Sequence, residues 1–155
     1  MNRIRSCLPK RAKQVYVLEL ESGKYYVGES NNPKNRIRAH FEGRGALWTR
    51  LYPPVQAIQP FTKRQDEFWE LSETIKRMSY HGIDNVRGSL FTKEHLTSYE
   101  KVMAAQLYCE MNNLCRKCGS ADHFMNQCIS LNKEPWIYRF GGLLLFENIS
   151  ECTAI

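Results

Sequence analysis

Four residues of metal-ligand type, gathered in one short stretch, constrain the fold of this chain more than any other sequence feature. Cys115, Cys118, His123 and Cys128 follow the spacing Cys-x2-Cys-x4-His-x4-Cys. Three thiolates and one imidazole at this spacing can surround Zn²⁺ tetrahedrally, within a loop too short to bury a hydrophobic core. We therefore predict a CCHC zinc knuckle at 114–129 that holds one structural Zn²⁺. Because such a site needs reduced thiols, the other cysteines are expected to be free.

Length and charge limit the remaining possibilities. With 155 residues, 43% of them hydrophobic and 25% charged, the chain can form one compact core with a small appendage, unlike disordered or collagen-like sequences. Residues 1–50 carry 11 Lys and Arg against 4 Asp and Glu, and the rest carries 11 against 12, so the net charge of +6 arises in the N-terminal third. This distribution favours a polyanionic partner, most commonly nucleic acid.

The hydropathy pattern argues against a membrane partner. The longest apolar run, at 141–146, is far shorter than the roughly 20 residues that a transmembrane helix needs, and no secretory signal precedes it. We expect an intracellular protein of the nucleus or cytoplasm.

Local patterns predict a mixed α/β (α+β) fold. Strands are expected at 14–20, 24–29 and 55–60. Helices are expected at 33–41 and 96–112, and a third helix is expected to begin at a capping box of Thr62 and Gln65 and to end at about Tyr80. The segments 43–54 and 83–88 are expected to be loops, the first containing a Trp48 that packs into the core. The order of these elements indicates a small three-stranded antiparallel sheet flanked by helices.

The last expected helix and the tail complete the prediction. Leu96, Tyr99, Met103, Leu107 and Met111 recur at helical spacing and are expected to form the inner side of the helix at 96–112. Beyond the knuckle, the apolar runs 136–140 and 143–146 flank two glycines and indicate a hairpin, packed on the core or in an oligomer contact.

Two strand tyrosines and a basic helix form the second informative pattern. Tyr16 lies in Val-Tyr-Val, Tyr26 in Tyr-Val-Gly with Gly28, and Arg36 and His40 follow one helical turn apart. This arrangement resembles the GIY-YIG nuclease family over residues 14–90, although the first motif has lost its glycine and isoleucine. Together with the knuckle, it is similar to GIY-YIG proteins of large DNA viruses and protists, which would place a viral member in the replication compartment.

The resemblance implies a domain order and further site residues. The resemblance implies a GIY-YIG-like nuclease core at 14–90, and composition and spacing add a basic arm at 1–13, a helical linker at 91–113, the knuckle at 114–129 and a tail at 130–155. The family's metal-binding glutamate and later asparagine correspond to Glu70 and Asn85. Asn85 could instead cap the loop that contains it, and Arg87 in the same loop could pair with a carboxylate.

Phosphodiester hydrolysis gives each of these residues a chemical role. The reaction needs a cation on a phosphate oxygen and a base that activates water. Arg36 suits the phosphate clamp, and Glu70 suits one catalytic Mg²⁺ or Mn²⁺. Tyr16 or Tyr26 would act as the base; the resemblance favours Tyr16, with His40 accepting or relaying its proton.

Basic side chains around the two motifs are candidates for nucleic-acid contacts. The set is Lys34, Arg38, Arg44, Arg50, Arg116, Lys117 and, as a stacking aromatic, Phe124. The knuckle itself could grip nucleic acid or serve only as a structural clip.

The sequence therefore predicts a metal-dependent DNA endonuclease, structure-selective and active in DNA repair, recombination or viral DNA processing. A catalytically silent module that binds DNA or RNA is the alternative, and a zinc-dependent protein adaptor is a third possibility. The oligomeric state stays open.

Overall fold

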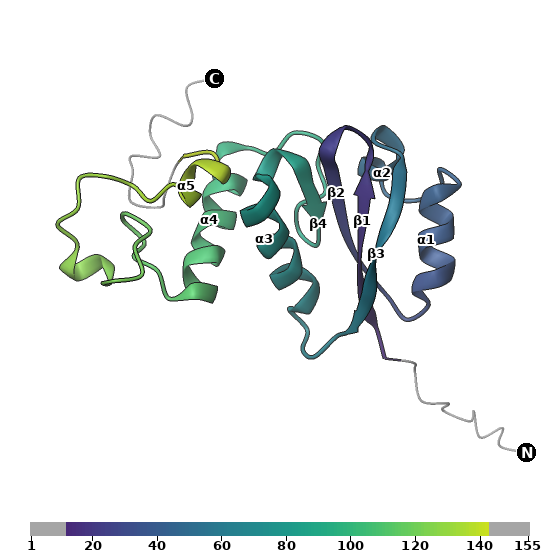
Figure 1. The fold of residues 1–155 in the computed structure, drawn as a ribbon, viewed down its shortest axis with the longest axis horizontal. Helices are drawn as coiled ribbons and strands as arrows, with labels where there is room; N and C mark the ends of the chain where they lie inside the picture. Colours follow the sequence, from purple (N-terminus) through teal and green to yellow (C-terminus); the bar gives the residue numbers. More distant parts are fainter. Residues whose placement is uncertain (1–11, 143–155) are drawn as a thin grey trace, which may run out of the picture.

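A twisted four-stranded sheet organises the part of the chain that the computed structural model describes, residues 12–142. The strands are β1 (Gln14–Leu20), β2 (Lys24–Ser30), β3 (Pro54–Lys63) and β4 (Val86–Gly88), in the order β3-β1-β2-β4. Helices cover both faces of the sheet, and the remaining helices and the knuckle continue from one side, so the molecule is elongated (Figure 1). The mixed α+β class is confirmed.

The sheet differs from the prediction in its fourth strand. β4 pairs in parallel with β2, so the described sheet is neither three-stranded nor wholly antiparallel. Only three residues form β4, inside the segment predicted to be a loop, and a strand this short has no detectable alternation. Arg87 anchors the region: its buried guanidinium donates to the backbone carbonyls of Ile83, Val86, Lys93 and Glu94. No carboxylate of residues 12–142 forms an ion pair with Arg87, so the alternative that Arg87 pairs with a carboxylate is wrong for this part of the chain.

The alternation of β1 creates two separate hydrophobic cores. Val15 and Val17 point to the face covered by α3 (Trp69–His81), where they pack with Ile75. Tyr16 and Leu18 point to the opposite face, which α1 (Pro33–Phe41) and α2 (Leu47–Leu51) cover. The second face holds the first tyrosine of the sequence motif.

Local capping fixes α1 where the sequence placed it. The Asn32 side chain accepts a hydrogen bond from the Asn35 backbone N–H, and Pro33 occupies the first helical position. The following segment was predicted to be a loop, but it contains α2, which buries Trp48 to 3% exposure as expected. A helix of five residues falls below the length that sequence periodicity detects.

The boundary between β3 and α3 also differs from the prediction. β3 continues to Lys63, so Thr62 lies in a strand and cannot cap a helix. α3 begins at Trp69 after a turn in which the Asp66 carboxylate accepts from the Phe68 N–H. The cross-strand bonds of β3 with β1 outweigh the capping signal, because capping contributes only about 1 kcal/mol.

α4 (Ser98–Asn112) begins at a capping box formed by Thr97 and Glu100. Its buried face consists of Val102, Ala104, Ala105 and Cys109, which join the core that α3 shares with the sheet. Tyr99 and Met111, predicted on the inner side, are exposed by 66% and 43%. The small alanine side chains let α4 approach α3 closely. The predicted inner face was instead chosen from the larger apolar side chains at helical spacing.

The end of the described chain is helical. α5 (Trp136–Arg139) replaces the first arm of the predicted hairpin, and the second arm at 143–146 lies outside the described residues. Most of the basic arm, residues 1–11, also lies outside them. Among residues 12–142, none of the helices has the length and apolar character to cross a membrane.

Candidate active site and metal centre

A chain of buried hydrogen bonds runs from β1 to α2 through α1. The Tyr16 hydroxyl lies 2.9 Å from His40 Nε2, and His40 Nδ1 lies 2.8 Å from the Thr49 hydroxyl. The Thr49 hydroxyl in turn donates to the Ala46 carbonyl at 2.9 Å. Tyr16, His40 and Thr49 are each at most 2% exposed, so bulk solvent has little access to these bonds.

This chain determines the proton positions. Because the single Thr49 proton goes to the Ala46 carbonyl, the Thr49 oxygen must accept from His40 Nδ1–H. The neutral imidazole then has an unprotonated Nε2, which accepts the Tyr16 proton. Thr49 was not predicted from the sequence, because a lone threonine after a loop belongs to no motif.

Two glycines make room for the two rings. A Cβ on Gly28 would lie 2.4 Å from the Tyr16 hydroxyl, and a Cβ on Gly45 would lie 2.0 Å from His40 Nδ1. Gly28 belongs to the second sequence motif, and its function there is to admit the tyrosine of the first. The two strand motifs are thus coupled by packing across the β1–β2 pair, in which Tyr16 lies opposite Gly28.

Tyr26 and Arg36 complete the cluster. The rings of Tyr16 and Tyr26 are 6.5 Å apart, and that of Tyr26 is 4.9 Å from His40. The exposed Arg36 guanidinium lies near both phenols. Burial raises the pKa of both tyrosines, and Arg36 opposes that rise. Burial and the nearby Arg36 lower the pKa of His40 to about 4, which keeps it neutral at physiological pH.

Glu70 lies in the first turn of α3 and faces the same cluster. Its carboxylate is half-buried, and the charge of that carboxylate raises the pKa of both tyrosines. Burial and the neighbouring Glu29 raise its pKa. A half-buried carboxylate fits a hard divalent cation, because Mg²⁺ takes few protein carboxylates and keeps most of its waters.

Glu29 is a second carboxylate that the sequence analysis did not single out. Its side chain is 8% exposed and pairs with Lys13 at 3.2 Å and Arg64 at 3.1 Å. Two cations neutralise Glu29, whereas the pKa of Glu70 is raised beside it. Glu70 is therefore the better candidate for a metal ligand. Only the tertiary contact of β2 with the ends of β1 and β3 reveals this arrangement.

Asn85 is not brought to this cluster. Its amide donates to the His81 carbonyl and accepts from Lys24 Nζ, at the C-terminal end of α3. Glu70 is at the other end of α3, about 16 Å from His81 along the helix axis. The placement matches a loop-capping role.

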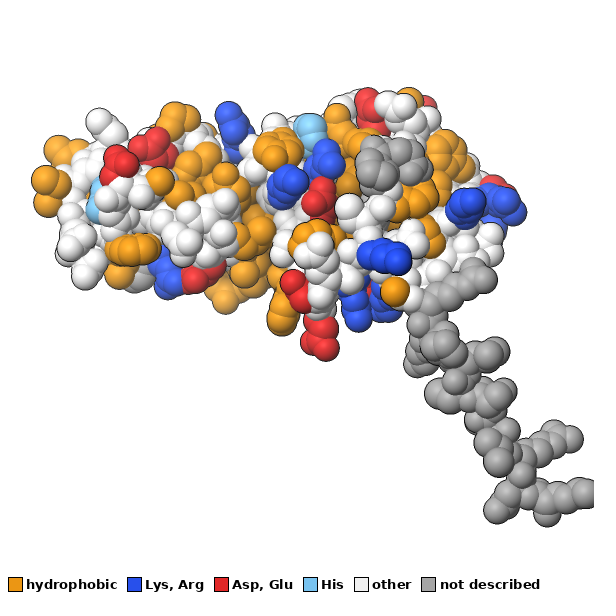
Figure 2. Space-filling model, turned by 60° about the horizontal axis from the view of Figure 1, so that its bottom comes forward, with side chains coloured by type: hydrophobic (Ala, Val, Ile, Leu, Met, Phe, Trp, Pro, Cys, Tyr) orange, Lys and Arg blue, Asp and Glu red, His pale blue; other side chains and the backbone are white. Residues whose placement is uncertain are grey.

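The predicted nucleic-acid contacts are divided between two regions. Lys34, Arg38, Arg44 and Arg50 are exposed on α1, on α2 and between them, where Arg44 pairs with Glu42. Figure 2 shows Lys and Arg side chains spread over the half that contains the sheet, while hydrophobic side chains dominate the other half. In that other half, Arg116 pairs with Glu110, and Lys117 and Phe124 are exposed.

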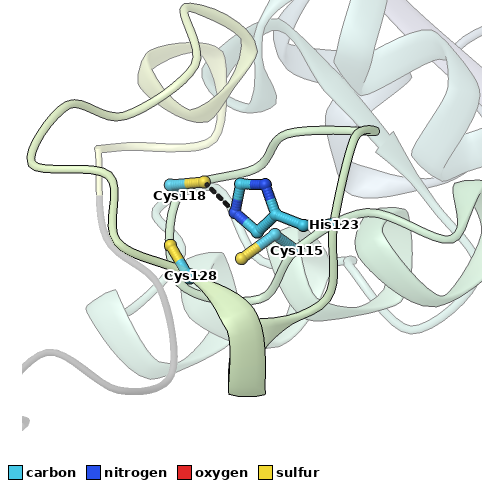
Figure 3. A group of neighbouring side chains, drawn as sticks. All are labelled: Cys115, Cys118, His123 and Cys128. Atoms are coloured by element: carbon cyan, nitrogen blue, oxygen red, sulfur yellow. Dashed lines mark hydrogen bonds between the residues drawn. The ribbon is translucent and has the colours of Figure 1, made fainter.

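The four predicted zinc ligands converge on one point. Cys115, Cys118, His123 and Cys128 direct their side chains toward a common centre (Figure 3), with all ligand atoms within 4.8 Å of one another. A tetrahedron with Zn–S bonds of about 2.3 Å has edges of about 3.8 Å, so the cluster is close to ligand geometry. The Lys117 N–H also donates to Cys115 Sγ at 3.4 Å, as expected for a thiolate. The donor set therefore fits zinc.

The knuckle is docked on the helices beside it. The Trp136 indole N–H donates to the Gly119 carbonyl at 2.9 Å, and the Glu134 N–H donates to the Cys118 carbonyl at 2.7 Å. A Cβ on Gly119 would lie 2.6 Å from the Trp136 indole nitrogen, so only glycine fits there. Trp136 packs on Tyr108 of α4. A metal that orders the knuckle therefore also orders its contact with the core.

Comparison with known proteins agrees with this site. Residues 12–80 match the GIY-YIG catalytic domain, a region that includes the tyrosines, Arg36, His40, Thr49 and Glu70. A UPF0213 protein of Xanthomonas axonopodis pv. citri is 42% identical over 52 residues, which are 32% of this chain and 51% of that protein.

Two other bacterial relatives are similar. A UPF0213 protein of Neisseria meningitidis is 44% identical over 41 residues, covering 26% of this chain and 45% of the relative. A UPF0213 protein of Streptococcus pneumoniae is 37% identical over 54 residues, covering 34% of this chain and 54% of the relative. The chain thus spans about half the length of these relatives. No solved structure matches significantly. The domain match covers less than half of this chain, and within residues 12–80 the chain is similar to a GIY-YIG catalytic domain.

Proposed function

We propose that this protein is a metal-dependent endonuclease that hydrolyses DNA phosphodiester bonds, with selectivity for flapped, branched or junction DNA. The observation that carries the proposal is the bond from the Tyr16 hydroxyl to the unprotonated nitrogen of His40, beside Arg36 and Glu70. An ordinary structural tyrosine has no need of a histidine whose tautomer is fixed by a further hydrogen bond.

The proton path follows from this geometry. Water attacks phosphorus in line and gives its proton to Tyr16 Oη, while the Tyr16 proton moves to His40 Nε2. Because burial raises the pKa of Tyr16, a stable phenolate does not form, and a concerted relay avoids it. Arg36 binds the phosphate oxygens and stabilises their charge in the transition state. The 3′ oxygen leaves when the P–O bond breaks and takes up a proton from solvent.

Substrate binding itself prepares His40 to accept the proton. Arg36 is one of the two causes that lower the pKa of His40. A bound phosphate neutralises the Arg36 charge and so removes that contribution to the lowered pKa of His40, while burial, the larger cause, persists. Free protein thus keeps a neutral histidine, and the complex holds a stronger base.

Glu70 would hold the one catalytic metal ion. Mg²⁺ or Mn²⁺ supplies Lewis-acid polarisation of the phosphate and charge neutralisation when bound. The half-buried position of Glu70 supports this role, because its charge acts on both tyrosines of the cluster.

The knuckle would grip the substrate at a distance from the catalytic cluster. A cavity of about 270 Å³ opens between the end of α4 and the knuckle, with Arg116, Phe124 and Met125 in its wall. Phe124 is 60% exposed and is available to stack on an unpaired base. Selectivity for branched or flapped DNA over a linear duplex is consistent with such a contact.

The test is cleavage of labelled linear, flapped and four-way DNA by wild type, Arg36→Ala and Glu70→Gln with Mg²⁺ or Mn²⁺, holding zinc and salt constant. Metal-dependent cleavage that both substitutions abolish, while DNA binding persists, is the expected result. A wild-type protein that binds DNA in a salt-dependent manner but cuts none of these substrates would instead be the silent binding module. A role in repair, recombination or viral DNA processing would follow from the preferred substrate.

A further inference from the structure

A second cavity lies on the same face of the sheet as the tyrosine cluster. It has a volume of about 190 Å³ and opens between α2, β2 and the segment that leads into α4. Three cationic side chains line it: Lys24, Arg87 and Lys101. None of the three belongs to the catalytic cluster.

The cations of this cavity are incompletely neutralised. Arg87 is 2% exposed and donates only to backbone carbonyls; no carboxylate of residues 12–142 lies within ion-pair distance of it. Lys24 Nζ likewise binds only neutral oxygens, those of the Asn85 amide and the Asp84 carbonyl. Lys101 pairs with the Asp84 carboxylate at 3.0 Å, but that carboxylate is 71% exposed, and exposed pairs are weak.

Aromatic rings stabilise two of these cations, and a helix terminus adds to the positive field. The Arg87 guanidinium lies 4.4 Å from the Trp48 ring centroid, and Lys24 Nζ lies 5.2 Å from that of Tyr52. Lys101 belongs to the first turns of α4, whose N-terminal dipole also points at the cavity wall. The carboxylates at the rim, Asp84 and Glu94, are both exposed, so a bound anion can displace them toward water.

The cavity is placed to meet the strand that enters the active site. Lys24 and Gly28 are four residues apart on β2 and face the same side, a separation of about 13 Å. A duplex strand carries one phosphate per about 3.4 Å of helix axis. A strand whose scissile phosphate lies at Tyr16 and Arg36 therefore presents another phosphate near Lys24 a few nucleotides away.

We propose that the cavity between Lys24, Arg87 and Lys101 is a second phosphate site, which binds a backbone phosphate of the DNA strand a few nucleotides from the scissile bond. This inference rests on the proposed function. It assigns the β4–α4 segment to substrate positioning, separate from chemistry and from the knuckle.

The experiment measures DNA binding as a function of salt, with no added divalent metal, in the Glu70→Gln background. Lys101→Met should weaken binding and lower the slope of log K against log salt by about 1. Asp84→Asn should do the opposite and tighten binding up to about fivefold, because it releases Lys101 from its ion pair. Unfolding by denaturant shows that each variant is folded.

Matched controls remove the effect of net charge alone. Lys76→Met and Glu73→Gln make the same charge changes on α3, which covers the other face of the sheet. If Lys101→Met and Asp84→Asn behave like these controls, the second site does not exist. If Arg36→Ala also leaves binding and its slope unchanged, DNA is not the partner, and the proposed function fails as well.

Titration with inorganic phosphate separates the two sources of a phosphate group. A site for a strand should bind free phosphate too weakly to saturate below tens of millimolar, because the strand supplies most contacts elsewhere. Saturation at micromolar phosphate that Lys101→Met abolishes would overturn the assignment to a DNA strand, since the cavity would then take a free phosphate compound.

Discussion

Replacing Thr49 by valine tests the proton relay at its least obvious member. Valine is nearly the same size but cannot accept from His40 Nδ1–H, a buried bond of 2.8 Å. A buried donor left without a partner costs about 1–3 kcal/mol. The imidazole can avoid this cost by moving its proton to Nε2, which then no longer accepts from Tyr16.

The expected loss follows from the tautomer equilibrium. If the whole cost of about 1–3 kcal/mol shifts the tautomer equilibrium of His40, the tautomer with its proton on Nδ1 becomes about 5- to 150-fold less populated. We expect kcat on a DNA flap to fall by that factor with KM nearly unchanged, because Thr49 touches no substrate. Thr49→Ser keeps the oxygen and should restore most of kcat.

The assay is single-turnover cleavage beside denaturant unfolding, with Ser79→Ala as the control. Ser79 is also buried, and its hydroxyl donates to the Lys76 carbonyl away from the site, so Ser79→Ala should lower stability alone. If Thr49→Val lowers stability but retains wild-type kcat, Thr49 only packs, and the relay is refuted. Equal kcat losses in the valine and serine variants would contradict it too.

Three further predictions concern pH, packing and zinc. The pKa of His40 is lowered from 6.5 to about 4 on folding, so the unfolded chain binds more protons between these two pH values. The free energy of unfolding should therefore fall as the pH drops from 6.5 to 4, by at most about 3 kcal/mol. In His40→Gln the free energy of unfolding, measured with denaturant, should change less over the same pH range. Gly28→Ala should displace the Tyr16 ring and reduce cleavage about 100-fold, since misplacement of about 1 Å has that effect. Removing zinc with a chelator, or Cys115→Ser, should release the Trp136 indole from its bond to the knuckle and shift its fluorescence.

Each of these has an outcome that contradicts it. A stability profile of His40→Gln that parallels wild type between pH 6.5 and 4 would show that His40 does not titrate as stated. Unchanged cleavage by Gly28→Ala would mean that the Tyr16 position is not critical. Elemental analysis should give one zinc per chain; a folded, metal-free knuckle with unaltered Trp136 emission would exclude a structural zinc site.

Short-range signals were enough for several parts of this molecule. The bounds of β1 and α1 follow from β-branched and aromatic residues and from the Asn32–Pro33 cap, and the four zinc ligands follow from spacing alone. In each case the residues that decide the structure are within a few positions of one another. Such interactions are local in the chain, so a sequence pattern records them.

Long-range contacts decided the rest. β4 exists because Tyr26 pairs with Arg87 across 61 positions of chain, and Thr49 becomes part of the site because α2 lies against His40. Glu29 is an ion-pair partner and Glu70 a candidate metal ligand because Lys13 and Arg64, from other strand ends, pair with Glu29. Burial and charge at these residues are set by segments distant in sequence, and no local pattern carries that information. The sequence by itself therefore determined the chemical groups and the zinc motif, while the tertiary structure decided their proton states, partners and accessibility.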